Sequence, residues 1–84
     1  MTDMTQKLYI RHVKTYNEIS LIRLEGKIDF DTSPMLKAFI NRLITQDKNS
    51  IILDFSRILF IDSYAISSLI SQIKESEKNG GFMK

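Results

Sequence analysis

One carboxylate and one hydroxyl stand side by side where an apolar run gives way to an amphipathic segment. Asp62 and Ser63 follow the apolar run Ile58–Ile61, and apolar residues at helical spacing come after them. At a helix N-terminus the backbone N–H groups are unpaired and the local potential is positive. A phosphate on Ser63 would be tolerated by the fold there, yet it would change the surface charge by about −2. The pair therefore suits a phosphorylation switch.

Catalysis by the chain itself is poorly supported. No Gly-x-Ser-x-Gly turn and no Gly-x-x-x-x-Gly-Lys loop occurs in the sequence. The single histidine, His12, has no spacing that suggests a relay to Ser63, and no cluster of residues has metal-ligand spacing. A separate kinase would have to supply nucleotide, magnesium and base, and this chain only an acceptor hydroxyl. We therefore expect a non-enzyme without a cofactor or a metal.

Composition narrows the class of protein further. With 84 residues, the chain is long enough for a single domain over residues 1–84. The net charge of +2 is small and its lysines and arginines are scattered, so we expect no direct binding of nucleic acid or membrane. The absence of cysteine excludes a disulfide framework and fits the cytoplasm.

The elements that must position Asp62 and Ser63 begin with a hairpin. Residues 8–16 and 19–25 alternate apolar and polar side chains around a tight turn, and Gly26 is expected to end the second strand. Ser33 then reads as the N-cap of a helix, with Pro34 at its first position.

A strand, a second helix and a short ending follow. The apolar run Ile51–Leu53 predicts a central strand covered on both faces, and a helix is expected after Ser63. Residues 82–84 look like the first residues of a further strand. The sequence thus predicts an α/β fold, in which a mixed sheet starts with an N-terminal hairpin and continues as helix, strand and helix. The side chains expected in the core from the two helices and from the segment before Ser63 are Met35, Leu36, Phe39, Ile40, Leu43, Ile44, Phe60, Ile66, Leu69, Ile70 and Ile73.

Three motifs in order along the chain resemble one known family. The segments Leu24–Asp29, Ile52–Phe55 and Phe60–Ser63 are similar to those of the STAS domain, and most of all to the bacterial anti-sigma factor antagonists. The resemblance runs from about Leu8 to Gly81. Relative to that family the last strand and helix are missing, so it implies a STAS-like domain truncated at its C-terminus. An open sheet edge or swapped elements would then favour a homodimer.

The resemblance implies a function in transcription regulation. In that family an anti-sigma factor that is also a serine kinase phosphorylates the serine after the aspartate. The unphosphorylated antagonist binds the anti-sigma factor and frees a sigma factor, whereas the phosphorylated form does not bind. Carried over by position, Ser63 is the phosphoacceptor, and Asp29, Asp62, Ser63 and Tyr64 form the partner-binding surface.

Other interpretations stay open. Ser63 could be a helix N-cap, Asp62 could simply favour the helix dipole, and Asp29 could end a strand by bonding its own backbone. The family usually has a small residue, a glycine, an aliphatic residue and a glycine after the Asp-Ser pair, where residues 64–67 read Tyr-Ala-Ile-Ser. The alternative function is a non-switching STAS scaffold, or an accessory subunit of a stress-signalling complex or a lipid-transport ATPase.

Overall fold

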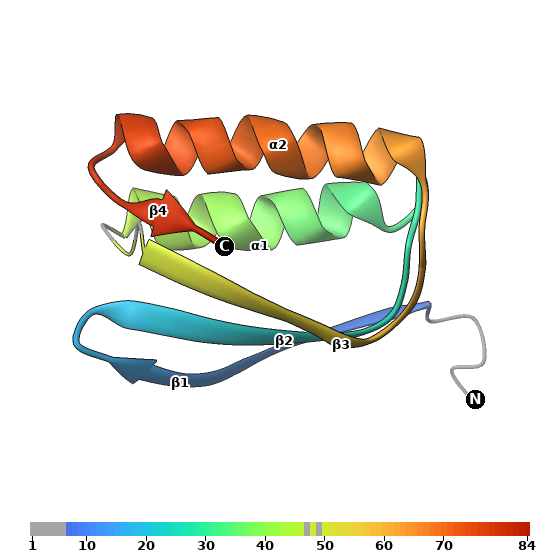
Figure 1. The fold of residues 1–84 in the computed structure, drawn as a ribbon, viewed down its shortest axis with the longest axis horizontal. Helices are drawn as coiled ribbons and strands as arrows, with labels where there is room; N and C mark the ends of the chain where they lie inside the picture. Colours follow the sequence, from blue (N-terminus) through green and yellow to red (C-terminus); the bar gives the residue numbers. More distant parts are fainter. Residues whose placement is uncertain (1–6, 47, 49) are drawn as a thin grey trace.

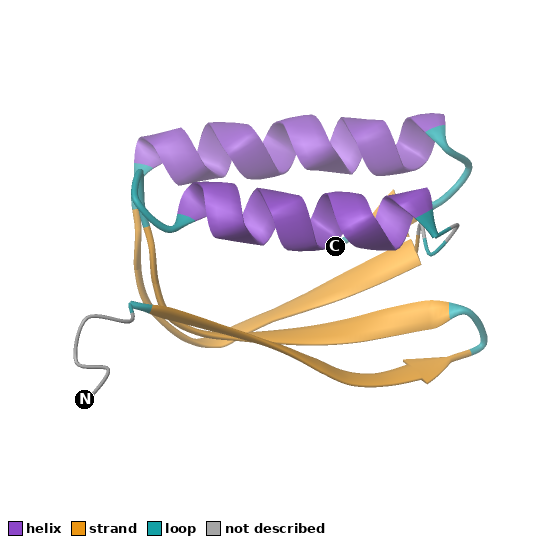
Figure 2. Ribbon diagram, turned by 180° about the vertical axis from the view of Figure 1, so that it is seen from behind, coloured by secondary structure: helices purple, strands orange, loops and turns teal. Residues whose placement is uncertain are grey.

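Four strands form one sheet in the order β1-β2-β3-β4, and two helices lie side by side over one of its faces (Figures 1 and 2). This computed structural model describes residues 7–46, 48 and 50–84. Within them the elements are β1 Leu8–Tyr16, β2 Ile19–Ile28, α1 Ser33–Thr45, β3 Ser50–Ile61, α2 Ser63–Lys78 and β4 Phe82–Met83. The predicted α/β fold with an N-terminal hairpin followed by helix, strand and helix is confirmed.

The hairpin forms where the sequence predicts it, but β2 is longer than expected. β1 and β2 pair antiparallel around Asn17 and Glu18, whose φ angles of 52° and 66° suit a two-residue hairpin turn. Gly26 does not end β2: it has a φ of 115°, which glycine tolerates, yet it pairs with Leu8 on β1, and Lys27 N–H donates to the carbonyl of Lys7 at 2.8 Å. β2 therefore carries the chain on to Ile28, beside the start of α2.

Two parallel crossovers complete the sheet. β2 pairs parallel with β3, and β3 pairs parallel with β4 through Ser50 and Ile51. After β4, the backbone N–H of Lys84 donates to the carbonyl of Ile51 at 2.9 Å. The prediction that residues 82–84 begin a strand is therefore confirmed, and relative to β3 this strand is short.

The N-cap of helix α1 lies one residue before the predicted position. Thr32 occupies the N-cap position, and Ser33 is the first helical residue, 3% exposed. The Thr32 hydroxyl donates to the carbonyl of Lys27 at 2.9 Å, which ties the helix start to the end of β2. The interpretation of Ser33 as the N-cap is wrong, since Thr32 is held in that place by the loop before it.

The core lies between the helices and the face of the sheet that they cover. It consists of Leu8, Ile22, Leu24, Ile28, Leu36, Ile40, Leu43, Ile51, Ala65, Leu69 and Met83. Removing this apolar surface from water is the main stabilising contribution to a domain of this size.

Four residues predicted for the core are exposed instead: Met35 by 43%, Phe60 by 51%, Ile66 by 46% and Ile70 by 48%. For α2 the reason is a rotation about its own axis. Gln72 is 3% exposed and donates to the carbonyl of Lys37 and to Asn41 Oδ1, both at 3.1 Å. At 100° per residue, turning Gln72 toward α1 points Ile66 and Ile70 away from it.

The strand β3 is covered on one face, not on both as its apolar run suggested. Both helices lie on the same side of the sheet in both views (Figures 1 and 2). Ile52, within that run, is 38% exposed. A single helical layer leaves the other face of the sheet open.

Candidate functional site

Ser63 is the first residue of α2 and its side chain is exposed. Within the described part of the chain, its hydroxyl makes no hydrogen bond, because the cap of the helix is supplied by the residue before it. The interpretation of Ser63 as an N-cap is therefore wrong. A hydroxyl that is exposed and not engaged in capping is available to another molecule.

Asp62 is the N-cap and also joins two loops. Its Oδ1 accepts from the backbone N–H of Ala65 at 2.8 Å, and its Oδ2 accepts from that of Phe30 at 3.0 Å. Its own N–H donates to the carbonyl of Ile28 at 3.1 Å. Both carboxylate oxygens are thus used inside the molecule, and they fix the start of α2 against the segment between β2 and α1.

Asp29 organises that same segment. Its Oδ1 accepts from the backbone N–H groups of Asp31 at 2.9 Å and Thr32 at 3.0 Å, as expected of an aspartate that bonds its own backbone. Its Oδ2 lies 3.7 Å from Lys7 Nζ, and its side chain is 19% exposed. Partial burial disfavours the charged form, but the Thr32 N–H and the Lys7 ammonium outweigh it, and the pKa of Asp29 lies below its ordinary value.

An aromatic pair flanks Ser63. The ring of Tyr64 meets that of Phe30 edge to face, with centroids 5.1 Å apart and planes at 73°. The two side chains are 51% and 66% exposed. The sequence analysis did not predict Phe30 at this site. Its position between Asp29 and Asp31, in the loop that carries one of the predicted site residues, could have indicated it.

The STAS domain family model matches residues 11–84. The chain belongs to this family. The structure of the anti-sigma factor antagonist SpoIIAA in its unphosphorylated form is 26% identical, with a TM-score of 0.74. The phosphorylated form of SpoIIAA from Bacillus is also 26% identical, with a TM-score of 0.73. An anti-sigma factor antagonist from Mycobacterium paratuberculosis is 21% identical, with a TM-score of 0.77.

These likenesses cover most of this chain but not all of its relatives. In each case 89% of this chain is aligned, against 69%, 68% and 63% of the three relatives in the order given. The chain thus spans about two thirds of their length. TM-scores of 0.74 and 0.73 with the two SpoIIAA forms are nearly equal, so the backbone likeness does not favour either phosphorylation state.

The predicted site residues of this STAS domain come from two neighbouring loops. The connection from β2 to α1 carries Asp29. Asp62 lies between β3 and α2, and Ser63 and Tyr64 are the first two residues of α2. The two connections run side by side at one end of the molecule (Figure 1). The Asp62 to Phe30 hydrogen bond and the Phe30 to Tyr64 contact join them directly. The loops therefore form one continuous surface around Ser63.

Among residues 7–46, 48 and 50–84, no group of three or more His, Asp or Glu side chains is arranged to hold a metal ion. No helix in the described part of the chain has the length and the apolar character needed to cross a membrane.

Proposed function

We propose that this chain is a phosphorylation-switched anti-sigma factor antagonist acting in the bacterial cytoplasm. Unphosphorylated, it binds an anti-sigma factor that is also a serine kinase, and a sigma factor is freed. Phosphorylated on Ser63, it is released. The chain acts as a binding partner and substrate of that kinase and not as an enzyme.

The proposal rests mainly on the different roles of Asp62 and Ser63 at the start of α2. Asp62 caps α2 and anchors the neighbouring loop, whereas the side chain of Ser63 makes no hydrogen bond to the described residues. Its modification therefore leaves the capping intact, and a phosphate at the first position of a helix also meets a favourable dipole. The added charge of about −2 acts on the partner instead.

Charge exclusion explains how such a switch would work. The surface around Ser63 already holds the carboxylates of Asp29 and Asp62, and both accept hydrogen bonds from the loop backbone. A phosphate beside them raises the density of negative charge at a contact that must lose its water on binding. The fold is unchanged, while the affinity for the partner falls.

Phosphorylation is tested directly with a candidate anti-sigma kinase and ATP. Mass spectrometry of the treated chain should find one phosphate, located on Ser63. Ser67 and Ser68 on α2 and the buried Ser33 serve as internal controls, since they share the loops or the helix with Ser63. Phosphate on one of these with Ser63 unmodified would overturn the assignment.

Binding is tested with two variants of Ser63. Ser63→Ala should retain most of the partner affinity but lose regulation, whereas Ser63→Asp should weaken binding by about tenfold through like-charge repulsion. Titration calorimetry against the unmodified kinase measures both. Lys14→Asp is the control, because it changes the net charge by as much as a phosphate does. Lys14 lies on β1 near the hairpin turn, opposite Leu21 at the start of β2, whereas Ser63 lies beyond the end of β2. Equal affinities for the Ala and Asp variants would rule out charge exclusion.

One observation favours a second candidate, a STAS scaffold or accessory subunit that does not switch. The exposed rings of Phe30 and Tyr64 stand beside Ser63, where a kinase would have to approach. An aromatic pair of this kind is also a common anchor of stable protein contacts. Tight binding of a partner that is unaffected by Ser63→Asp but lost in Tyr64→Ala would favour this candidate.

A further inference from the structure

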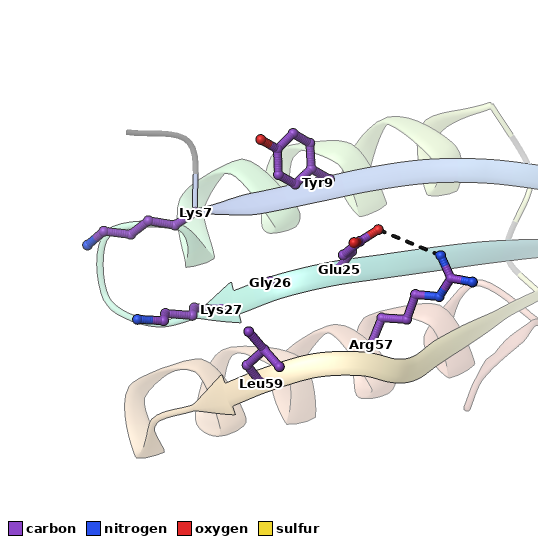
Figure 3. Close-up of a pocket in the computed structure, with 7 residues that line it drawn as sticks. All are labelled: Lys7, Tyr9, Glu25, Gly26, Lys27, Arg57 and Leu59. Atoms are coloured by element: carbon purple, nitrogen blue, oxygen red, sulfur yellow. Dashed lines mark ion pairs between the residues drawn. The ribbon is translucent and has the colours of Figure 1, made fainter. Parts of the chain in front are cut away.

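The open face of the sheet, away from the helices, contains a hollow of about 590 Å³ near the end of β2 (Figure 3). It extends across three strands: Tyr9 lies on β1, Gly26 on β2 and Leu59 on β3. Its volume falls in the range of about 300 to 1,000 Å³ that small-molecule sites have. None of the four predicted partner-binding residues lines this hollow.

The two sides of the hollow are apolar and in contact with water. Tyr9 is 50% exposed and Leu59 is 80% exposed. In Figure 3 they stand on opposite sides of β2, with the backbone of Gly26 between them. A flat or aliphatic group placed between these side chains would remove apolar surface of both from water, which is favourable in proportion to the area covered.

The end of the hollow is basic. The amino groups of Lys7 and Lys27 extend toward the same end of the sheet, where β2 ends (Figure 3). Lys27 has no ion pair within the described residues, whereas Lys7 pairs with Asp31 at 3.1 Å. Arg57 lines the hollow further along, 3.9 Å from Glu25, and both of these side chains are more than half exposed. A long, solvated pair of this kind is weak and can be rearranged by a ligand.

Positive charge is concentrated on this face relative to the whole chain. A second hollow beside the first shares Tyr9, Glu25 and Arg57, and adds Arg11 and Arg23. The two hollows together are lined by five cationic side chains and one acidic one, although the chain as a whole has 12 basic and 10 acidic residues. Three of the five have acidic partners, since Arg23 pairs with Asp54 and Lys7 with Asp31, both at 3.1 Å, and Arg57 lies 3.9 Å from Glu25. Arg11 and Lys27 have no ion pair among the described residues. The remaining excess favours an anionic ligand.

We propose that this hollow binds a small organic anion, a carboxylate or phosphate joined to an aromatic or aliphatic body. The anionic group lies by Lys27 and Lys7, and the body lies against Tyr9 and Leu59. Because Lys7 also contacts Asp29 and Asp31, the ligand shares one cation with the loop that leads to the Ser63 surface. An inorganic anion would contact only the lysines, and a neutral aromatic compound only the apolar side chains.

The test is an NMR titration of the isotopically labelled chain with three probes: phenyl phosphate, inorganic phosphate and phenol. Phenyl phosphate should shift the amide signals of Gly26, Lys27 and Leu59 in a saturable way, with a dissociation constant of about 1 mM or tighter. Phosphate alone and phenol alone should each bind at least about threefold more weakly. Equal binding of phosphate and phenyl phosphate, or shifts confined to the start of α2, would overturn the proposal.

Variants of exposed side chains sharpen this test without threatening the fold. Lys27→Gln should weaken phenyl phosphate binding by about threefold, and Glu25→Gln should strengthen it by a similar factor, since it frees Arg57 and removes a repelling charge. Leu59→Ala should weaken phenyl phosphate but leave phosphate unchanged. Lys14→Gln, on β1 outside the hollow, is the matched control. Equal losses in Lys27→Gln and Lys14→Gln would show only a general charge effect and would overturn the site.

The anion could be a free compound or the headgroup of a lipid, and a further arm separates the two sources. The chain is sedimented with vesicles of phosphatidylcholine alone or mixed with phosphatidylglycerol. Saturable binding of phenyl phosphate without binding to either vesicle supports a free ligand. Binding to the anionic vesicles that Lys27→Gln abolishes supports a headgroup in the same hollow. Binding to vesicles without any response to phenyl phosphate would overturn the proposed small-molecule site.

Discussion

At the scale of single residues, Asp62 is the side chain on which the geometry around Ser63 depends. It caps α2 through Ala65 N–H and holds the neighbouring loop through Phe30 N–H. Asp62→Ala leaves both donors without this acceptor, and loss of a helix cap alone costs about 0.5 to 2 kcal/mol. We expect the free energy of unfolding, measured by urea denaturation, to fall by about 1 to 2 kcal/mol.

The control for this change is Asp31→Ala in the adjoining loop. Asp31 is 69% exposed and contacts Lys7 at the surface, so its loss should change the free energy of unfolding by less than about 0.5 kcal/mol. If the two variants unfold at the same urea concentration, then Asp62 does not act as the cap in solution.

The carboxylate of Asp54 makes the stability of the domain depend on pH in the acidic range. Hydrogen bonds from the hydroxyl and N–H of Ser56, together with Arg23, lower the pKa of Asp54 to about 2 from an ordinary value of 3.8. The folded state thus favours the carboxylate, and this stabilisation is present above about pH 4 and is lost as the pH falls through about 2. Melting temperatures measured from pH 5 to pH 2 should fall more steeply for the wild type than for Asp54→Asn. Parallel curves would contradict this assignment.

The sequence was informative about which residues belong to the candidate site and less so about what each does. Asp62 and Ser63 could be found because an apolar run ends there and a helical pattern begins. Which of the two caps the helix could not be predicted, since Asp and Ser both cap helices well. In the structure Asp62 is the cap, and its other carboxylate oxygen accepts from Phe30 N–H. A contact between residues 32 positions apart leaves no local signal in the sequence.

At the scale of elements, two glycines with positive φ can be compared directly. Gly26 in β2 has a φ of 115°, and a Cβ added there would lie 2.0 Å from the carbonyl oxygen of Lys7. Gly80, after α2, has a φ of 87° but no atom within 4 Å of such a Cβ. The two positions therefore separate backbone strain from steric overlap.

Gly80→Ala should cost about 1 to 2 kcal/mol, the strain of a left-handed backbone alone. Gly26→Ala should cost clearly more, because it also forces apart β1 and β2 at the hydrogen bond between Lys27 N–H and the Lys7 carbonyl. Thermal unfolding of both variants followed by circular dichroism measures the difference. A Gly26→Ala variant as stable as Gly80→Ala would mean that the start of β1 is not held in this way.

Element order and type followed from the sequence, whereas the rotation of elements did not. The hairpin and both helices could be predicted because periodicity is a local property. The outward turn of Ile66 and Ile70 could not, since the hydrophobic pattern of α2 is satisfied equally well by facing them inward. The buried amide of Gln72 decides the matter through its bonds to α1. A polar residue on the inner face of a helix is the kind of feature that apolar patterns overlook.

At the scale of the whole molecule, the side next to β3 and β4 is open. β4 pairs with the start of β3 at Ser50 and Ile51, and Leu53 N–H donates to the carbonyl of Lys84 at 2.6 Å. On α2 the exposed Ile66 and Ile70 adjoin the partly buried Ile73. The register between β2 and β3 shifts twice, between Arg23 and Glu25 and again between Gly26 and Lys27. Irregularities of this kind make a strand edge a poor template for pairing with another chain.

We therefore expect copies of this chain to associate through the isoleucine stripe of α2, formed by Ile66, Ile70 and Ile73, more than through the edge of β3. Exposed apolar surface of this kind favours contact between molecules. Sedimentation at several concentrations should show a dimer or higher oligomer. Ile70→Lys should shift the chain toward monomer by placing a charge in the contact, and Tyr16→Lys, at a site 71% exposed on the hairpin, should not. If both variants associate as the wild type does, then edge pairing or exchange of elements is the mode of association. A well-folded monomer at every concentration would show that the 84-residue chain closes its own core and that the stripe is tolerated in water.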